Sequence, residues 1–267
     1  MNTSLKNKTV LVTGGASGIG KGIATRFAQK GCNLLLVDIN ETDLEKTVND
    51  LNEFSSEQKI RFLCGDLTDK NFRNTIVTYL KEEFESVNIL INCAGIYPTR
   101  PALEVDEEMW DAVFNLNVKA SFFLTQAVAS IMIETGIKDG AVINITSTAS
   151  EVARPGAAPY CSSKAAMKMM TQVLALELAP YGIRVNGVGP GLVETETLLK
   201  TLVTEHAKKE HKEKLTYCPM ARTAEISEIA DATIFIASPH ASYITGQNLL
   251  VDGGYSAGRV FKTFQHN

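Results

Sequence analysis

Tyr160 and Lys164 are the two residues whose types and spacing most directly suggest chemistry. The chain has seven tyrosines, and only Tyr160 is followed by a lysine four positions later. In a helix, residues at this spacing lie on one face, a turn apart. A free phenol titrates near pH ~10, and a fixed ammonium beside it lowers that pKa toward the range useful for general acid–base catalysis. Taken alone, the segment Tyr160–Lys164 fits a surface helix better, so the choice depends on the rest of the chain.

The elements that would position this pair alternate along the chain. Strand-like apolar runs and helix-like periodic segments follow one another between residues 9 and 251, which predicts a parallel sheet with helices on both faces. We expect an α/β fold in a single domain over residues 1–267, with a doubly wound parallel sheet of about seven strands. The expected strands are 9–12, 33–37, 59–64, 88–91, 140–145, 183–188 and 247–251, and the expected helices are 21–30, one from residue 41, 71–84, 107–134, 160–178, 198–215 and 224–237.

A glycine-rich loop joins the first expected strand to the first expected helix. Its residues 13–20 are Thr-Gly-Gly-Ala-Ser-Gly-Ile-Gly. Gly14 permits a tight turn, Gly18 lets the backbone approach a pyrophosphate, and Gly20 lets the helix pack on the strand. The helix N-terminus then presents free N–H groups and the positive end of its dipole to an anion. The loop therefore predicts a dinucleotide phosphate site.

Asp38 ends the second expected strand, 18 residues beyond the last glycine of the loop. A carboxylate there accepts hydrogen bonds from an adenosine ribose diol and repels a 2′-phosphate. Its alternative role is to cap the helix that begins near Glu41. The neighbours Ser17 and Ile39 are not basic, and Lys21 is the one cation close by in the sequence. The spacing favours the contact with the ribose. A carboxylate that repels the 2′-phosphate, without a basic residue to bind that phosphate, predicts a preference for NAD over NADP.

Further polar residues and glycines stand where other expected strands end. They are Asp66, Asn92, Ser147, Pro190 and Gly191. Ligands of parallel sheets bind beyond the carboxyl ends of the strands, and packing alone does not explain polar groups gathered at one sheet edge. This edge is therefore the predicted active site.

Composition and charge limit the classes of partner that the protein could bind. The chain is 45% hydrophobic and 21% charged with a net charge of −4, so it lacks the basic footprint of a nucleic-acid-binding protein. We expect no membrane partner either, because residues 1–8 are too polar for a signal peptide and no stretch approaches the ~20 apolar residues of a membrane span. The four histidines form no ligand set, so no metal is expected.

Five cysteines are scattered along the chain without a Cys-x-x-Cys pair. The odd count and the wide spacing argue against a disulfide framework and against a zinc site. We expect reduced, mostly buried thiols in a cytoplasmic protein. The five are Cys32, Cys64, Cys93, Cys161 and Cys218.

Together the motifs resemble the short-chain dehydrogenase/reductase family, in the branch with a Thr-Gly-x-x-x-Gly-x-Gly loop. The resemblance runs from about residue 6 to 256 and includes Asn92–Gly95 and Pro190–Thr195. Cys93 replaces the second asparagine of the family's Asn-Asn-Ala-Gly motif. The resemblance implies a Rossmann-type domain that binds NAD. It assigns cofactor contacts to Gly14, Ser17, Gly18, Ile19, Gly20, Asp38, Asp66, Leu67, Asn92, Ala94, Gly95, Tyr160, Lys164, Pro190, Gly191, Val193 and Thr195.

The family's chemistry fits the pair considered first. The resemblance implies that Tyr160 exchanges a proton with the substrate oxygen while a hydride moves to or from the nicotinamide. Ser147 would hydrogen-bond the same oxygen, and Lys164 would lower the pKa of Tyr160 and bind the nicotinamide ribose. Asn117, which matches the family's catalytic-helix asparagine, would hold a water that links Lys164 to solvent. The expected catalytic residues are Asn117, Ser147, Tyr160 and Lys164.

The predicted function is the interconversion of a secondary alcohol and a ketone by NAD(H)-dependent hydride transfer. A sugar, polyol or other hydroxy compound is the expected small-molecule substrate, and oxidation is the expected direction. A 3-oxoacyl-thioester reductase shares every motif and stays an alternative. A nicotinamide-binding redox sensor without turnover is a second alternative, and the complete set of Ser147, Tyr160 and Lys164 argues against it.

The substrate site is the part that the sequence defines least. Its expected walls are the loop 96–101, the segment 148–159 and a lid over residues 192–215. The polar candidates for these walls are Arg100, Glu151, Arg154, Glu194 and Glu196, most of which we expect to face solvent. The expected substrate contacts are Ser147, Tyr160, Glu151 and Arg154.

Apolar residues cover much of the surface of two expected helices, 107–134 and 160–178. They include Phe122, Phe123, Met167, Met169 and Met170. One sheet face cannot cover all of them, and large exposed apolar patches mark interfaces. The resemblance, in which these two helices pair across subunits, implies a homotetramer.

Overall fold

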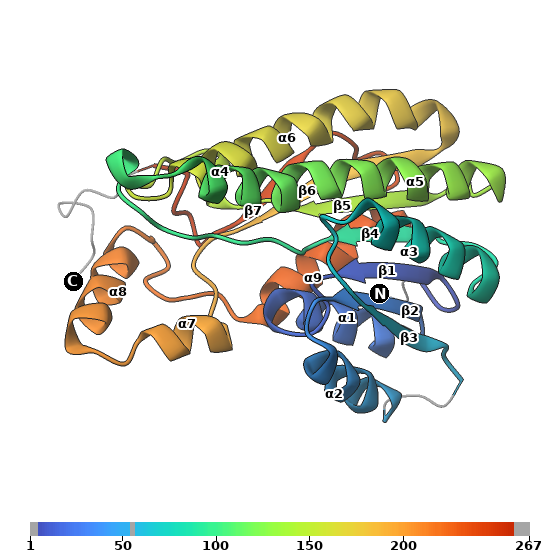
Figure 1. Cartoon of the computed structure of the whole chain (residues 1–267), viewed down its shortest axis with the longest axis horizontal. Helices are drawn as coiled ribbons and strands as arrows, with labels where there is room; N and C mark the ends of the chain where they lie inside the picture. Colours follow the sequence, from blue (N-terminus) through green and yellow to red (C-terminus); the bar gives the residue numbers. More distant parts are fainter. Residues whose placement is uncertain (1–4, 54–56, 259–267) are drawn as a thin grey trace.

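A seven-stranded parallel sheet lies at the centre of the computed structural model, which describes residues 5–53 and 57–258. The strand order is β3-β2-β1-β4-β5-β6-β7 (Figure 1). The predicted α/β fold with a doubly wound parallel sheet is confirmed, and the order reverses between β1 and β4, where such sheets bind ligands. The strands are β1 (Thr9–Thr13), β2 (Asn33–Asp38), β3 (Ile60–Cys64), β4 (Ile89–Asn92), β5 (Gly140–Ile145), β6 (Ile183–Pro190) and β7 (Asn248–Val251).

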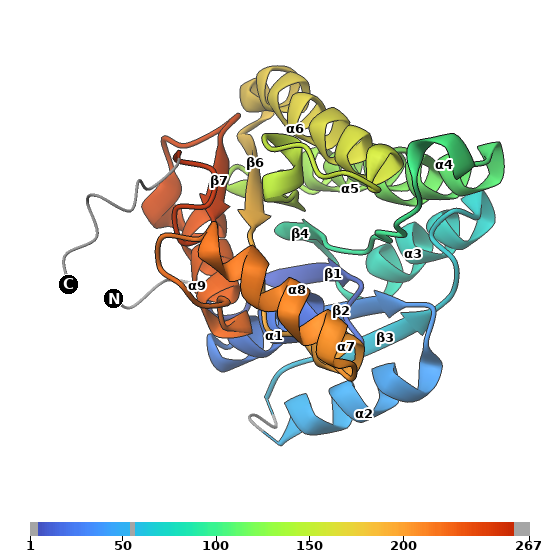
Figure 2. The same ribbon diagram turned by 90° about the vertical axis from the view of Figure 1, so that its left-hand side faces the viewer.

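Helices cover both faces of this sheet (Figures 1 and 2). One core layer forms under α1 (Gly18–Gln29), α2 (Glu41–Asn52) and α9 (Ile226–Ala237), and the other under α3 (Lys70–Glu83), α5 (Ser121–Glu134) and α6 (Ala158–Leu178). In β2, Leu34 and Leu36 join the first layer, while Leu35 and Val37 join the second. Successive side chains of a strand point to opposite faces, so a strand buried on both faces is apolar throughout.

The helix predicted for residues 107–134 is interrupted at its middle. It consists of α4 (Glu107–Phe114), a π-helical turn (Asn115–Ala120) and α5. Such turns insert an extra residue into a helix and occur often at functional sites. The interruption places Asn117 inside the π-helical turn.

The run Glu107–Glu134 is also long and apolar enough to cross a membrane, by length and composition alone. The expectation that no stretch approaches a span was therefore too strong. Half of its most apolar window is nevertheless buried inside the protein, where α5 supplies Leu124 and Val128 to the second core layer. This is how a core helix of a folded protein packs.

Two helices stand where one was predicted for residues 198–215. They are α7 (Glu196–Thr201) and α8 (Glu205–Thr216), separated by a short turn. Both helices lie beside the carboxyl edge of the sheet and away from its two faces (Figure 1). Short 3₁₀ helices occupy Ala102–Glu104, Thr148–Ser150, Ala179–Tyr181 and Pro239–Ala241.

All five cysteines are free, but their burial differs from the prediction. Cys32 and Cys218 are buried, Cys93 and Cys161 are half-buried, and Cys64 is exposed. The expectation of mostly buried thiols was therefore wrong for Cys64, which ends the edge strand β3. Among the described residues, no group of histidine, cysteine and carboxylate side chains could hold a metal ion.

Candidate active site

The glycine-rich loop brings the start of α1 to the carboxyl end of β1. Gly14 has a φ of 67°, in the region that favours glycine. A Cβ on Gly20 would lie 1.9 Å from the Gly14 carbonyl oxygen, so only glycine fits there. Ser17 is the N-cap of α1, and its side chain makes no capping hydrogen bond. Backbone N–H groups of the first turn thus remain for an anion, and the loop fits a dinucleotide pyrophosphate.

Thr13 ties this loop to the segment after β4. Its Oγ1 accepts hydrogen bonds from the N–H groups of Cys93 (3.0 Å) and Ala94 (3.2 Å). A Cβ on Gly14 would lie 3.0 Å from Ala94 backbone atoms, so the two predicted cofactor segments touch. Thr13 was not among the predicted site residues, although its place at the start of the motif is the signal for it.

Asp38 ends β2 directly beside the glycine-rich loop. Its Oδ2 accepts a hydrogen bond from the Ala16 N–H (3.1 Å), and its Oδ1 accepts from the Ile39 N–H (2.7 Å). The residue that caps α2 is Asn40, whose side chain accepts from the Asp43 N–H. The capping alternative for Asp38 was therefore wrong, and its carboxylate instead belongs to the loop that would hold the cofactor.

Lys21, the cation considered near Asp38, is paired elsewhere. Its Nζ lies 2.8 Å from Asp50 Oδ2. Within residues 5–53 and 57–258, no basic side chain forms an ion pair with Asp38. The negative charge at the end of β2 is thus uncompensated.

Three further cofactor predictions concern residues after β3 and in β4. The exposed carboxylate of Asp66 accepts two hydrogen bonds from Thr68, each of 2.8 Å, and stays open to a ligand. The side chain of Leu67 packs in the core. The side chain of Asn92 is 1% exposed and donates from Nδ2 to Thr125. Any ligand contact of Leu67 or Asn92 is therefore limited to the backbone.

Ser147, Tyr160 and Lys164 come together where β5 ends and α6 begins. The Ser147 side chain is close enough to the Tyr160 hydroxyl to lower its pKa by hydrogen bonding. Lys164 is buried, donates from Nζ to the Ile145 carbonyl (2.7 Å) and lies 5.7 Å from the centre of the Tyr160 ring. The predicted helix is confirmed, and both residues lie on one face of it.

Burial dominates the pKa values of this pair. It raises the pKa of the Tyr160 hydroxyl, while the hydrogen bond with Ser147 and the charge of Arg154 act in the opposite direction. It also lowers the pKa of Lys164 from 10.5 to about 8, because a buried ammonium loses its hydration. The pKa of Tyr160 is thus raised, Lys164 is not among the groups that lower it, and the predicted effect of Lys164 on Tyr160 stays a prediction.

Asn117 fixes the loop after β4 against α6. Its Oδ1 accepts from the Ile96 N–H (2.9 Å), and its Nδ2 donates to the Ile96 carbonyl (3.0 Å) and to Ser163 Oγ (3.1 Å). The residue is fully buried. The side chain thus acts here on the protein itself, and the predicted water between Asn117 and Lys164 stays a prediction.

The segment after β6 meets the glycine-rich loop. Thr195 Cγ2 lies 3.9 Å from the place that a Cβ on Gly18 would occupy, and the Thr195 hydroxyl caps α7. Val193 pairs with Ala224 in an isolated parallel bridge. The predicted segment Pro190–Thr195 therefore leads from the sheet across to the loop.

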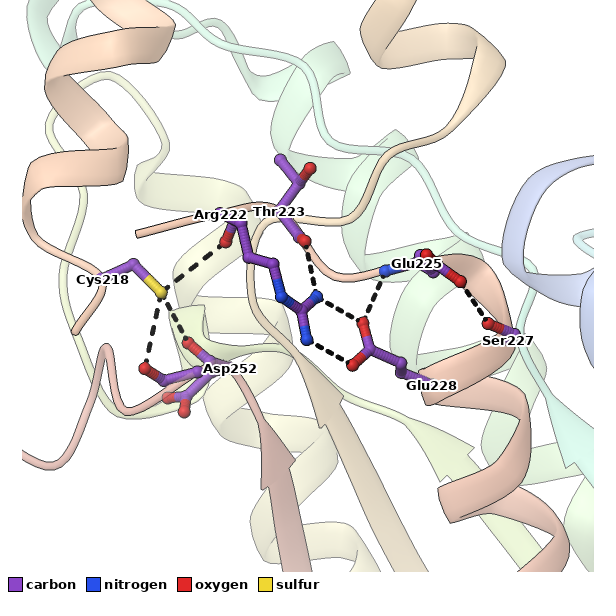
Figure 3. Close-up of polar contacts among 8 residues, drawn as sticks. Cys218, Arg222, Thr223, Glu225, Ser227, Glu228 and Asp252 are labelled. Atoms are coloured by element: carbon purple, nitrogen blue, oxygen red, sulfur yellow. Dashed lines mark hydrogen bonds and ion pairs between the residues drawn. The ribbon is translucent and has the colours of Figure 1, made fainter. Parts of the chain in front are cut away.

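The segment 192–223, which contains the predicted lid 192–215, is fastened again where it returns to the sheet (Figure 3). The Arg222 guanidinium forms two 2.7 Å bonds with the Glu228 carboxylate, which hold the pKa of that carboxyl down at about 2. The Cys218 Sγ lies 3.5 Å from the carbonyl oxygens of Asp252 and Gly253. This segment is thus attached at both ends.

Tyr97 is a residue of the substrate side that the sequence analysis missed. Its ring meets that of Tyr160 edge-on, with centroids 6.1 Å apart, and it is 53% exposed. It lies in the loop 96–101, which was expected to form a wall, and the Arg100 N–H of that loop donates to the Gly156 carbonyl (2.8 Å). Nothing in the sequence singles out Tyr97 from other loop residues.

Most predicted polar substrate residues have partners within the protein. Arg100 is bonded to Asp106. Glu151 pairs with Lys168 (2.7 Å), and its contact with the substrate stays a prediction. Arg154 is exposed and close enough for its charge to act on Tyr160. Glu194 accepts a hydrogen bond from Thr223 (3.4 Å), and the Glu196 carboxylate lies 3.8 Å from the Lys200 Nζ.

Comparisons with known proteins agree with this geometry. A family model described as enoyl-(acyl carrier protein) reductase matches residues 14–256. The NAD-dependent glycerol dehydrogenase of Listeria innocua is 38% identical over 95% of each chain. The 3-oxoacyl-(acyl-carrier-protein) reductase of Thermotoga maritima is 36% identical over 94% of this chain and 98% of its own. The crystal structure of levodione reductase superposes with a TM-score of 0.89 at 30% identity, over 95% of this chain and 99% of its own.

The parallel sheet, the glycine-rich loop and the hydroxyl groups of Ser147 and Tyr160 define a Rossmann-type oxidoreductase that uses a nicotinamide cofactor. The chain belongs to the short-chain dehydrogenase/reductase family. It is an enzyme that interconverts secondary alcohols and ketones by hydride transfer.

Proposed function

We propose that this enzyme uses NAD(H) in preference to NADP(H), and the uncompensated carboxylate of Asp38 carries the proposal. The site fits a dinucleotide because Gly20 leaves no room for a side chain and the start of α1 is uncapped. A 2′-phosphate beside Asp38 would meet a like charge, at a cost on the order of a few kcal/mol. Lys21 cannot relieve that cost while it is paired with Asp50.

The proposed chemistry assigns separate roles to residues that follow β5 and to residues in the first turns of α6. Bound NAD supplies the hydride acceptor. Tyr160, as the phenolate, accepts the proton of the substrate hydroxyl, and Ser147 hydrogen-bonds that hydroxyl from its place beside Tyr160. Lys164, which is charged near neutral pH because its pKa of about 8 lies above it, would bind the cofactor ribose and stabilise the Tyr160 phenolate with its ammonium.

A small hydroxy compound such as a sugar or polyol is the proposed substrate, with oxidation as the working direction. Tyr97 offers an apolar ring edge beside Tyr160, and Arg154 adds a positive charge. 3-Oxoacyl-thioester reduction stays the second candidate, because the Thermotoga maritima reductase resembles this chain nearly as closely as the glycerol dehydrogenase does. A sensor without turnover is disfavoured, since it has no use for the hydroxyl pair.

We also propose a cytoplasmic homotetramer built from one domain per subunit. Apolar side chains are exposed along α5 and α6 in the monomer, which supports pairing of these helices between subunits. They are Phe123, Ile133, Met169, Val173 and Leu176, with exposures from 41% to 79%. Light scattering that returns the monomer mass of 29.0 kDa would contradict the tetramer.

The test of the cofactor proposal is kcat/KM with each cofactor, for the wild type and for Asp38→Ala. Sugars, polyols, hydroxysteroids and 3-oxoacyl thioesters are screened first by NADH absorbance to find a substrate. The wild type should favour NAD, and the variant should shift relative use toward NADP by about tenfold or more, equal to ~1.4 kcal/mol. NADP preference in the wild type, or an unchanged ratio in the variant, would contradict the role of Asp38.

A further inference from the structure

A hydrogen bond crosses over β6 to join the end of β5 to β7. The Thr146 hydroxyl donates to Asn248 Oδ1 at 2.6 Å. Thr146 immediately precedes Ser147, and Asn248 is the first residue of β7. The bond therefore connects the residue before the proposed substrate-binding hydroxyl to a strand two places along the sheet.

The opposite side of Ser147 is tied to the same asparagine. Asn248 Nδ2 donates to Ser150 Oγ (3.4 Å) and to Glu151 Oε1 (3.3 Å). The Ser150 hydroxyl in turn donates to the Ser147 carbonyl (2.7 Å). One amide thus uses its acceptor on one side of Ser147 and its donor on the other.

Glycines of β6 make room for this arrangement. A Cβ on Gly187 would lie 2.4 Å from Asn248 Oδ1, and one on Gly189 would lie 2.9 Å from Thr146 Oγ1. At the first distance the side chains would have to shift apart. The hydrogen bond between Thr146 and Asn248 therefore depends on the absence of side chains at Gly187 and Gly189.

Glu151 anchors the outer end of the network. Its carboxylate is bonded to Lys168 of α6 at 2.7 Å and 2.8 Å, and these bonds, with those from Asn248 and Ser150, lower its pKa. Lys168 lies four residues beyond Lys164 on the same helix. The network thus joins the turn that carries Ser147 to the helix that carries Tyr160.

We propose that Asn248 is a positioning residue for the reaction, which holds the Ser147 hydroxyl against Tyr160 by bonding to both sides of Ser147 from β7. The inference rests on the proposed role of Ser147. Asn248 is far along the chain from every motif residue of the active site. The fold brings its side chain to the residues on both sides of Ser147. Without this side chain, the turn after β5 loses its ties to β7 and keeps the bond from the Thr146 N–H to the Val188 carbonyl and the ion pair of Glu151 with Lys168.

The first test compares Asn248→Ala with Asn186→Ala. Asn186 is a matched control, since its buried amide also ties β6 to the chain before β7, through the Ile244 carbonyl and the Gln247 N–H, but does not contact the Ser147 turn. Asn248→Ala should lower kcat about tenfold or more, because displacing a reacting group by ~1 Å costs up to about 10²-fold, with NADH affinity within about twofold. Asn186→Ala should lower the thermal midpoint without a comparable loss of kcat.

The second test keeps the size of the side chains and exchanges their roles. Asn248→Asp places a carboxylate 3.3 Å from Glu151, so kcat should fall; adding Glu151→Gln supplies an amide donor again, and the double variant should recover most of the loss. No recovery, or wild-type kcat in Asn248→Ala, would overturn the proposal. Ser147→Ala distinguishes failure of the proposed function from failure of the positioning role. If Ser147→Ala keeps wild-type kcat, the proposed function fails. If Ser147→Ala is inactive but Asn248→Ala is unaffected, only the positioning role of Asn248 is rejected.

Discussion

The carboxyl ends of β1 to β5 and the lid approach each other at the active site, but they are held in different ways. On the sheet side, Thr13 of β1, Asn117 of the π-helical turn and Lys164 of α6 are buried and bonded to neighbouring elements. In the lid, no described side chain between Glu194 and Tyr217 is buried. Several of its ion pairs are local, such as Lys214 with Glu210 at 2.7 Å. The sheet therefore builds one side of the site in advance, whereas the other side depends on attachments at its two ends.

Tyr160→Phe should have the largest effect, because it removes the reacting hydroxyl from the prebuilt side and leaves the ring in place. We expect kcat to fall by about 10²–10⁴-fold, while NADH affinity stays within about twofold. Stopped-flow turnover and NADH fluorescence measure the two quantities. Tyr97→Phe is the control, since it keeps the ring contact next to Tyr160. A Tyr160→Phe enzyme with a tenth of wild-type kcat would refute the acid–base assignment.

Lys164→Met should stabilise the ligand-free protein while abolishing most activity. Near pH 7 the lysine is charged in both the folded and the unfolded chain, and the shift of its pKa from 10.5 to about 8 corresponds to a cost on the order of 3 kcal/mol in the folded state. Between these two values the folded protein releases the proton first, so the cost fades as the pH rises.

Thermal unfolding of both proteins at several pH values checks this prediction. The midpoint of Lys164→Met should exceed that of the wild type near pH 7, and the difference should shrink toward pH 10.5. A difference that is absent near pH 7, or that grows with pH, would show that burial of the ammonium is not costly.

Arg154→Gln should have the smallest effect, since it removes an exposed charge from the substrate side. The charge of Arg154 lowers the pKa of Tyr160, so its loss should raise that pKa and move the acid limb of the pH profile for oxidation upward. Added salt should reduce the difference between variant and wild type. Arg100→Gln, whose guanidinium is bonded to Asp106, should leave the profile in place.

The same contrast explains what the sequence could predict. Strands and helices alternate with clear periodicity, and parallel strands bring their carboxyl ends to one edge, so Asp38, Ser147 and the Tyr160–Lys164 pair could be placed before the structure was known. The direction of the Tyr160 pKa shift could not, because it depends on burial and on the carbonyl that Lys164 contacts.

Contacts between distant parts of the chain account for the other differences. Glu151 was expected at the substrate, but its partners are Lys168 and Asn248, which lie 17 and 97 residues away. Tyr97 meets Tyr160 only because the loop after β4 folds over α6. The break between α7 and α8 was also missed, because both helices are polar and no buried face fixes their length.

Hydrogen exchange of the backbone amides, with and without NADH, tests most directly whether one side of the site is built in advance. In the ligand-free protein, amides of α7 and α8 should exchange faster than those in the middle of α6, because few buried contacts oppose their opening. NADH should then add protection at residues 13–20 and 92–96. Protection of α7 and α8 equal to that of α6 before NADH is added, or no NADH-dependent change at residues 13–20, would contradict the account.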